Sequence, residues 1–389
     1  MKRTLLVTLD FPPHIGGVAR YYDQLSRHLP SDFFLVFAPS VSDAHEVSAQ
    51  RAYDQHVTFR VLRGRFFWKW MWPHWLPLLW RVGCVVRKEH IEHVLVGQIL
   101  PVGTVLWLLN LISSIGVFPV FSYTVMTHAM DVMLVHQTPR KKWLAKHILA
   151  NAHSVTSVST FTKEYLQRFG VVENRLHVLP PGVSTSMFGS STSRSDIRKE
   201  MQCEDAFLLL SVGRLVERKG YDRVIQALSA LSGRYPHIHY LIVGAGPYET
   251  ALRALVVRTG LVNRVHLIGQ VSDNNLPSYY ATCDVFILPT RVLDAGKDVE
   301  GFGIVFLEAA SFGKPVIAGN TGGVTDAVID EVTGLLVDPE NISHLATAIE
   351  RLYTNPVLRS RFGEAGKKRV QEQFQWPTIA KKFEALLSS

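Results

Sequence analysis

The sequence predicts an α/β protein with two doubly wound domains, each built on a parallel sheet. In both halves of the 389-residue chain, short runs that are apolar throughout alternate with helix-length segments. Such runs are typical of parallel strands that helices cover on both faces. Residues 179–188, rich in proline, glycine and serine, separate the halves and suit a connector. The predicted domains are residues 1–182 and 183–374, and a last helix, 375–389, packs back on the first domain.

The first half contains five predicted strands. Its charge-free stretch, residues 93–130, is long enough to conceal a transmembrane helix. Prolines and glycines, among them Pro101, Gly116 and Pro119, instead divide it into a strand, a helix over 102–115 and a second strand. The five predicted strands are 3–9, 33–39, 93–98, 118–128 and 154–159.

The second half is more regular. Segments 222–235 and 248–260 have the length of helices and lie between predicted strands. Another helix is predicted to begin near Phe302 or Gly303. The predicted strands are 207–215, 240–247, 265–271, 284–290 and 314–320.

Composition indicates the compartment and the charge of a partner. The three cysteines are far apart and form no C-x-x-C pair, which argues against a disulfide framework or a zinc site and fits a reducing compartment. Residues 1–189 hold 19 Lys and Arg against 11 Asp and Glu, whereas residues 190–389 hold 22 of each. An anionic partner that contacts only the first half is therefore predicted.

Two carboxylates, Glu300 and Glu308, lie at the two ends of an apolar stretch that follows a predicted strand. The helix predicted to begin near Gly303 would offer free backbone N–H groups to an anion such as phosphate. Ligands of open α/β sheets bind at this edge. One acid would then face each hydroxyl-bearing end of a ligand with phosphate between them. The alternative is that both acids pair with lysines.

Other candidates also lie in strand-to-helix loops. Arg214 and Lys219 suit a pyrophosphate, because charge-assisted hydrogen bonds to phosphate are strong, although a solvated basic loop is the alternative. Gly16 and Gly17 precede a helix and offer backbone donors, without forming a G-x-G-x-x-G dinucleotide motif. His128 ends an apolar strand, where it is either structural or placed at the ligand edge of the sheet.

Five motifs follow one another along the chain: the glycine pair, His-x-x-Asp, G-R-x4-K-G, a strand ending in G-x-V, and E-x7-E. In this order they resemble glycosyltransferase family 4, whose members are retaining enzymes of the GT-B fold. The resemblance covers essentially the whole chain and is most specific over residues 207–340. It implies two Rossmann-like domains facing across a cleft. Ala129 stands where the family usually has glycine, and Asp326 where it usually has glutamate. These departures affect the fine geometry of the site.

The resemblance also implies a role for each candidate. Arg214 and Lys219 would hold the diphosphate of a nucleotide sugar, and His128 would touch the sugar near the reacting centre. The remaining implied contacts are Gly16, Gly17, Gly303 and Ile304 on the diphosphate, Glu300, Phe302 and Gly303 on the sugar, and Gly244, Val271, Asp273 and Glu308 on the nucleoside.

The expected reaction is hexosyl transfer with retention, through front-face attack on an oxocarbenium-like state. The departing diphosphate oxygen would take the acceptor's proton, and neither a metal nor a cofactor is expected. The stretch 294–309 looks like the phosphatidylinositol mannosyltransferase branch of the family. A carboxylate at Asp273 could accept hydrogen bonds from guanine, which uracil does not offer. GDP-mannose is therefore favoured, with UDP-sugars next.

Residues 60–88, here named the basic aromatic segment, hold seven Lys or Arg, seven Phe or Trp and no acid. Residues 139–147 add four cations. Trp favours the headgroup level of a bilayer, and Lys and Arg are attracted to anionic lipid. We predict peripheral attachment to the cytoplasmic face of a membrane and a lipid-linked or glycan acceptor, and no nucleic acid. The alternative is that these aromatic residues are buried in a helix hairpin.

Two other functions fit the same architecture. A sugar-nucleotide epimerase would need no acceptor, which would leave the basic aromatic segment unexplained. A non-catalytic lipid- or sugar-binding protein would not need the complete set of donor motifs. Detection of free nucleoside diphosphate together with a heavier lipid would distinguish the glycosyltransferase from both.

Overall fold

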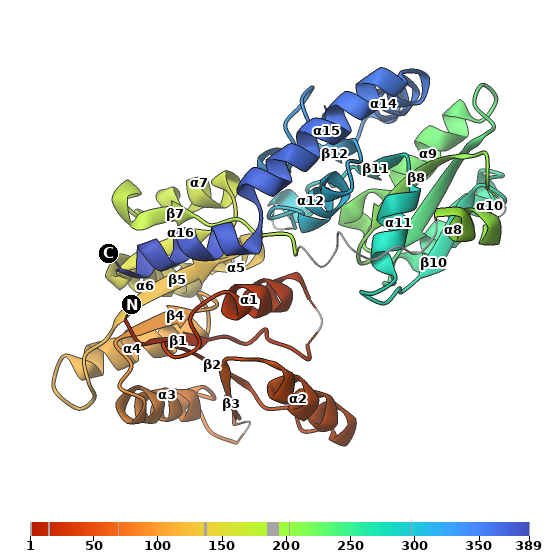
Figure 1. The fold of residues 1–389 in the computed structure, drawn as a ribbon. Coiled ribbons are helices and arrows are strands. Elements are labelled where there is room, and N and C mark those ends of the chain that lie inside the picture. Colours follow the sequence, from red (N-terminus) through yellow and green to blue (C-terminus); the bar gives the residue numbers. More distant parts are fainter. Residues whose placement is uncertain are drawn as a thin grey trace. The chain divides into compact units, whose positions relative to one another are not determined.

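The computed structural model describes residues 2–14, 16–68, 70–135, 138–184, 194–201, 203–296 and 298–388. The chain divides into two compact units. Unit 1 comprises Met1–Gly182 and Trp376–Ser389, and unit 2 comprises Val183–Gln375. Each unit contains its own parallel sheet flanked by helices (Figure 1).

Unit 1 is built on a parallel sheet whose described strands run in the order β3-β2-β1-β4-β5-β6-β7. The strands are β1 (Thr4–Val7), β2 (Phe34–Pro39), β3 (Arg60–Gly64), β4 (His93–Val96), β5 (Ser122–Thr127), β6 (Ser154–Ser157) and β7 (Leu176–Val178). The helices are α1 (Gly17–Arg27), α2 (Ala44–His56), α3 (Leu76–Lys88), α4 (Val102–Ser113), α5 (Ala129–Val135), α6 (Pro139–Asn151), α7 (Thr160–Arg168), η1 (Glu173–Arg175) and α16 (Trp376–Ser388).

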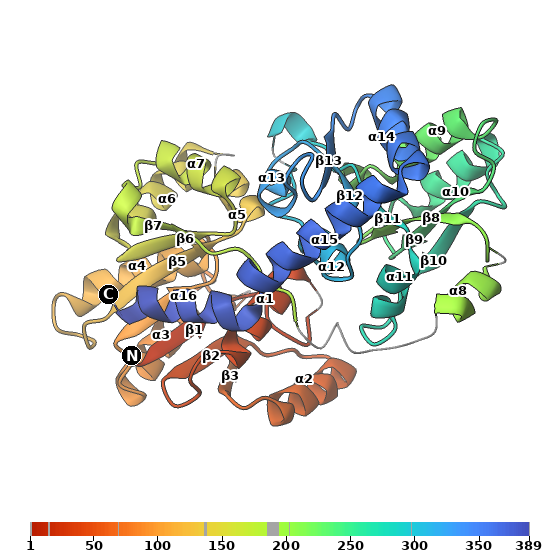
Figure 2. The same ribbon diagram turned by 45° about the horizontal axis from the view of Figure 1, so that its top comes forward.

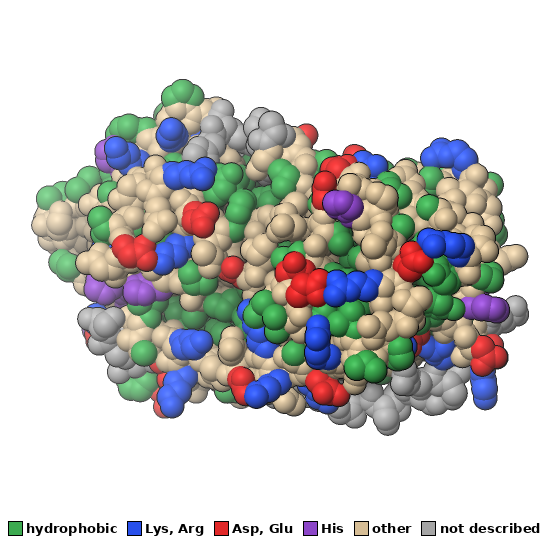
Figure 3. Space-filling model, turned by 90° about the horizontal axis from the view of Figure 1, so that it is seen from above, with side chains coloured by type: hydrophobic (Ala, Val, Ile, Leu, Met, Phe, Trp, Pro, Cys, Tyr) green, Lys and Arg blue, Asp and Glu red, His purple; other side chains and the backbone are tan. Residues whose placement is uncertain are grey.

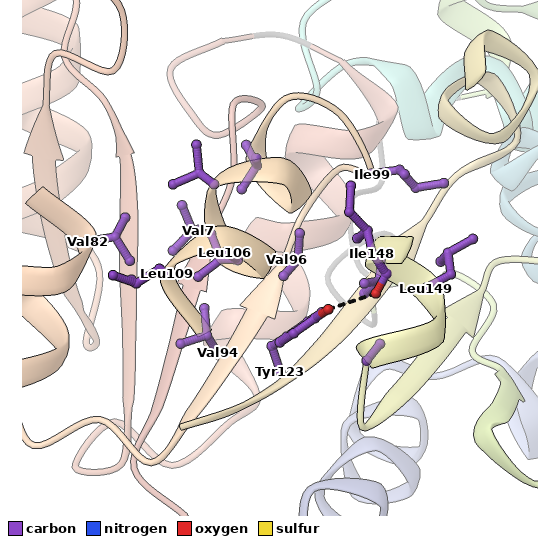
Figure 4. Close-up of a cluster of buried hydrophobic side chains, with 14 of the residues drawn as sticks. Val7, Val82, Val94, Val96, Ile99, Leu106, Leu109, Tyr123, Ile148 and Leu149 are labelled. Atoms are coloured by element: carbon purple, nitrogen blue, oxygen red, sulfur yellow. Dashed lines mark hydrogen bonds between the residues drawn. The ribbon is translucent and has the colours of Figure 1, made fainter. Parts of the chain in front are cut away.

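The core of unit 1 lies between the sheet and three of these helices. Figure 4 shows α3, α4 and α6 contributing Val82, Leu106 and Ile148 to a cluster that also contains Val94 and Tyr123 from the strands. The Tyr123 hydroxyl donates to the Ile148 carbonyl at 2.7 Å, so α6 is also fixed to β5 by a buried hydrogen bond. Helix α4 contacts both α3 and α6, and the three therefore form one layer on one face of the sheet.

Unit 2 is built on a parallel sheet whose described strands run in the order β10-β9-β8-β11-β12-β13. The strands are β8 (Phe207–Val212), β9 (Ile238–Val243), β10 (Val265–Gly269), β11 (Val285–Leu288), β12 (Val316–Gly319) and β13 (Gly334–Val337). The helices are α8 (Arg194–Glu200), η3 (Glu217–Lys219), α9 (Tyr221–Leu231), α10 (Glu249–Arg258), α11 (Leu276–Thr282), η4 (Asp294–Gly296), α12 (Ile304–Ser311), α13 (Val324–Ala327), α14 (Ile342–Thr354) and α15 (Pro356–Gln373) (Figure 2).

The charge-free stretch of unit 1 forms β4, α4 and β5, as the prolines and glycines predict. Its helix spans only Val102–Ser113. In the part of the chain that the structure describes, no helix combines the length and apolar character needed to cross a membrane.

Some cations of the basic aromatic segment are paired with carboxylates. Arg60 is in an ion pair with Glu89 at 2.9 Å, and Arg63 is in one with Asp54 at 2.7 Å. The segment itself holds no acid, and these carboxylates come from outside it. Lys69 lies outside the described residues. On the face seen in Figure 3, many acidic side chains likewise lie next to basic ones.

Replacing Leu106 tests the packing of the helical layer on the unit 1 sheet. Leu106 is fully buried, so Leu106→Ala should reduce stability by about 2–5 kcal/mol through lost burial and a residual cavity. Leu111 lies on the same helix and is 56% exposed. Leu111→Ala is therefore the matched control, with an expected change of about 0.5 kcal/mol or less. Equal melting temperatures for the two variants would contradict this packing.

Candidate active site

The candidate residues of unit 2 lie in loops that follow the carboxyl ends of its strands. In parallel sheets these ends meet at one edge, where ligands of open α/β folds bind. The loop after β8 approaches the loop after β9 so closely that a Cβ on Gly244 would lie 2.0 Å from the Gly213 carbonyl oxygen. The Gly244 N–H also donates to the Gly269 carbonyl at 2.8 Å, which joins the ends of β9 and β10.

Glu300 is held by two cations from the loop after β8. One of its carboxylate oxygens accepts from Arg218 Nη1 at 2.7 Å and from Lys219 Nζ at 2.5 Å. Arg218 Nε also lies 2.7 Å from Asp298. Burial alone would raise the pKa of the Glu300 carboxyl, but the charges of Lys219 and Arg218 outweigh it and lower this pKa to about 2. Glu300 is therefore fully ionised at neutral pH.

The backbone of Glu300 is fixed by the glycine pair after β12. The Gly323 N–H donates to the Glu300 carbonyl at 2.9 Å. Gly322 has a φ of 56°, and a Cβ there would lie 2.4 Å from the same carbonyl oxygen. The sequence T-G-G thus allows the β12 loop to lie directly against Glu300.

Helix α12 begins directly after the loop that carries Glu300. Gly303 is its N-cap, with a φ of 85°, and a Cβ there would lie 2.4 Å from the Phe306 ring. Ile304 is the first helical residue, so its N–H lies among the free donors at this helix end. Phe302 is buried and its ring lies 5.9 Å from that of Phe374. The structure therefore places Phe302 in the unit 2 core, and its contribution to a ligand site would come from the backbone.

Glu308 lies on α12 and is only 2% exposed. It accepts a hydrogen bond from the Tyr280 hydroxyl at 2.7 Å. Tyr280 comes from α11 and is fully buried, so it fixes the orientation of the carboxylate. Tyr280 could not be predicted from the sequence, because nothing in the local pattern of α11 marks it.

The two cations predicted to share a diphosphate differ in the structure. Lys219 is engaged with Glu300, whereas Arg214 is exposed and has no ion pair with any described residue. The loop between them is fixed by Arg291, whose side chain is 3% exposed and pairs with Asp222 at 3.1 Å and Glu217 at 3.0 Å. Arg218 and Arg291 were not predicted.

The predicted base-contacting residues follow β10. Val271 is half-buried and Asp273 is exposed. The hypothesis that Asp273 selects guanine assumed a buried carboxylate. In the structure this carboxylate is in solvent, so only a bound base could desolvate it.

In unit 1, the glycine pair lies at the start of α1. Gly16 is the N-cap and Gly17 the first helical residue. A Cβ on either glycine would meet no atom within 4 Å. Packing within the chain therefore does not require glycine at these positions, and the space beside the helix amides is open.

Tyr22 connects His128 to the end of β4. The Tyr22 hydroxyl donates to the Gly97 carbonyl at 2.6 Å and lies 3.0 Å from His128 Nε2. Because a phenol has one proton, Nε2–H must donate to the Tyr22 oxygen, which leaves Nδ1 as an acceptor. Burial lowers the pKa of His128 to about 4, so the ring is neutral at physiological pH.

Asp131 closes the His-x-x-Asp turn at the start of α5. The His128 N–H donates to Asp131 Oδ1 at 2.8 Å, and the Ile99 N–H donates to Oδ2 at 3.4 Å. Burial raises the pKa of Asp131, and these two hydrogen bonds lower it. Burial has the larger effect, so the pKa is about 7. The motif thus connects the ends of β4 and β5.

Both halves of the chain match known protein families. Residues 15–187 match the family described as Glycosyltransferase Family 4, and residues 193–369 match Glycosyl transferases group 1. A Mycobacterium tuberculosis protein named GDP-mannose-dependent alpha-(1-6)-phosphatidylinositol monomannoside mannosyltransferase is 33% identical over 98% of this chain and 97% of its own length. A Corynebacterium glutamicum mannosyltransferase, named for a monoacylated form of the same acceptor, is 30% identical over 100% of this chain and 98% of its own.

Solved structures show the same fold. Anabaena HepE in complex with UDP aligns over 100% of both chains with a TM-score of 0.83 and 20% identity. Sucrose-phosphate synthase from Thermosynechococcus elongatus aligns over 100% of this chain and 98% of its own, with a TM-score of 0.76 and 24% identity. Fold and site thus define a glycosyltransferase with the GT-B fold. The chain belongs to glycosyltransferase family 4.

The ion pairs of Glu300 predict a pH-dependent stability. Because the pKa is lower in the folded chain, the pairs contribute fully above the ordinary glutamate pKa of about 4.5, and the contribution is lost as pH falls toward 2. Glu300→Gln should therefore lower stability by about 3 kcal/mol at pH 7, and by less at pH 4.

Glu331→Gln is the matched control, because Glu331 is 51% exposed and pairs with the exposed Arg351. Its expected cost is below about 1 kcal/mol. Thermal unfolding at both pH values tests the prediction. A cost for Glu300→Gln that is equal at pH 7 and pH 4 would contradict it.

Proposed function

We propose that this glycosyltransferase transfers mannose from GDP-mannose to a phosphatidylinositol-based glycolipid, with retention of anomeric configuration and without a metal. The observation that carries the proposal is the ionised Glu300 between Lys219 and the amino end of α12. The mannosyltransferase relatives, which match over nearly their whole lengths, support the choice of donor and acceptor.

Glu300 suits a contact with sugar hydroxyls better than proton transfer. A general base works best with a pKa near the operating pH, whereas that of Glu300 is about 2. A weakly basic carboxylate that stays ionised accepts hydrogen bonds without removing protons. Glu308, eight residues further on, would accept hydrogen bonds from the ribose hydroxyls. Its carboxylate also accepts a hydrogen bond from the Tyr280 hydroxyl.

The leaving diphosphate would be stabilised by charge and by backbone donors. Arg214, Lys219 and the first N–H groups of α12 lie at the same sheet edge of unit 2. Fixed donors of this kind stabilise developing negative charge without reorganisation. The departing oxygen would then accept the acceptor's proton. In this account the protein cations take the part that a metal would otherwise play.

The donor is tested by incubating the enzyme with GDP-mannose, UDP-glucose or UDP-galactose and vesicles containing phosphatidylinositol mannoside. We expect GDP and a lipid heavier by one hexose with GDP-mannose, and roughly tenfold less product with the UDP-sugars. The α-configuration of the product, read by NMR, tests retention. Faster transfer from a UDP-sugar would overturn the choice of base, and a β-linked product would overturn retention.

We further propose that the enzyme works at the cytoplasmic face of a membrane, with the outer side of α3, α4 and α6 toward the lipid. The inner side of these helices packs on the sheet. The outer side carries exposed apolar side chains: Trp80 is 65% exposed, Leu111 56% and Trp143 53%. The ring centroids of Trp107 and Trp143 lie 6.2 Å apart, and this contact connects α4 to α6. Tryptophan and nearby lysines are typical of a surface at the headgroup level.

The lysines of this layer give a test by vesicle flotation. Lys88, Lys142 and Lys146 are exposed, and replacing all three by Gln should weaken binding to anionic vesicles by about 1 kcal/mol each at low salt. Control substitutions of Arg361, Lys367 and Lys368 on α15 should have little effect. Wild-type protein that stays unbound to anionic vesicles at low salt would contradict membrane docking.

A further inference from the structure

Unit 1 has a pocket that the donor site does not use. Its volume is about 630 Å³, within the range of roughly 300–1,000 Å³ that holds one small ligand. The loop between β3 and α3 supplies most of the wall, and the start of α6 supplies the rest. The lining residues are Phe67, Trp68, Trp72, Pro73, His74, Trp75 and Arg140.

The pocket lies at the carboxyl edge of the unit 1 sheet. Its loop follows β3, and α6 begins in the connection after β5. The glycine pair after β1 and His128 after β5 lie at this same edge. A molecule in the pocket is therefore on the side of unit 1 where the candidate reaction residues lie.

The pocket is preformed by hydrogen bonds within its loop. The Trp68 N–H donates to the His74 carbonyl at 3.1 Å, and His74 Nδ1 lies 2.9 Å from the Trp68 carbonyl, to which it donates. Trp75 packs against the core of unit 1. Trp72, in contrast, is 80% exposed, so folding alone gains little from an indole at this position.

The lining has one cation among aromatic rings. Arg140 is exposed and forms no ion pair with any described residue. A free sugar would need more polar partners than this lining offers, because sugar hydroxyls must be hydrogen-bonded when they leave water. An acyl chain beside a phosphate satisfies both the aromatic wall and the arginine.

We propose that this pocket receives the glycerol-proximal part of an acyl chain of a phosphate-bearing lipid, with Arg140 at the phosphate. The proposal rests on the proposed function. An acceptor hydroxyl that reaches the reaction edge draws the first methylenes of its lipid out of the bilayer. Exposing them to water costs free energy, and the aromatic wall offsets this cost by replacing the apolar surroundings.

Photolabelling tests the proposal. The probe is phosphatidylinositol with a diazirine on an acyl carbon next to the ester, in phosphatidylglycerol vesicles, and labelling is normalised to bound protein. We expect the labelled peptide to include residues 67–75 in the wild type and in Phe33→Ala. Phe33 is 45% exposed and lies outside both the lining and the helices α3, α4 and α6, so it is a matched control. Trp72→Ala should lose this label at least fivefold.

A second pair of probes tests the role of Arg140. Arg140→Gln should reduce labelling by the phosphatidylinositol probe roughly tenfold, equivalent to about 1.4 kcal/mol, but leave labelling by the matching diacylglycerol probe unchanged. Equal loss with both probes would overturn the phosphate contact. Labels found only outside the 67–75 peptide, or an undiminished label in Trp72→Ala, would overturn the pocket assignment. Absence of mannosyl transfer would count against the proposed function alone, since labelling needs no donor.

Discussion

The shared contact of Glu300 with Lys219 and Arg218 connects the loops on which the unit 2 site depends. Lys219 and Arg218 come from the loop after β8, Glu300 from the loop after β11, and Gly323 fixes its backbone from the loop after β12. A carboxylate buried to this degree is stable only when it is paired, because removal from water penalises the charge. The two cations therefore keep Glu300 ionised and fix its position before any ligand arrives.

The same principle of preorganisation appears in unit 1 with neutral groups. Tyr22 accepts from Nε2 of His128, so the ring presents its other nitrogen as an acceptor and stays uncharged. The open space beside Gly16 and Gly17 leaves the α1 amides available. Charge in unit 2 and neutral hydrogen bonding in unit 1 suit the two sides of a glycosyl transfer. The diphosphate needs cations, whereas a sugar needs hydrogen-bond donors and acceptors in fixed positions.

Much of the fold was predictable because buried parallel strands are apolar throughout. The edge strands β3, β7 and β13 were missed. R-V-L-R-G and L-H-V are not apolar runs, and edge strands need not be. The run in β13, G-L-L-V, has only four residues. In the site, the E-x7-E spacing indicated Glu300 and Glu308, but no local pattern could show that Lys219 pairs with Glu300. That pairing joins residues 81 positions apart. Arg218, Tyr280 and Tyr22 were missed for the same reason, as their partners lie far along the chain.

The roles proposed for Glu300, at the donor sugar, and for Glu308, at the nucleoside, can be measured separately. Calorimetry of GDP binding measures the contact with the nucleoside end of the donor, and turnover of GDP-mannose measures the contact with its sugar. Both are measured in Glu300→Gln and in Glu308→Gln. Glu300→Gln should bind GDP within about threefold of the wild type. It should lose transfer by roughly 100-fold or more, which is the cost of a charge-assisted contact made at the reacting sugar. Glu308→Gln should lose about tenfold or more in GDP affinity, since a ribose contact is removed. Loss of GDP affinity in Glu300→Gln, with affinity kept in Glu308→Gln, would contradict the account.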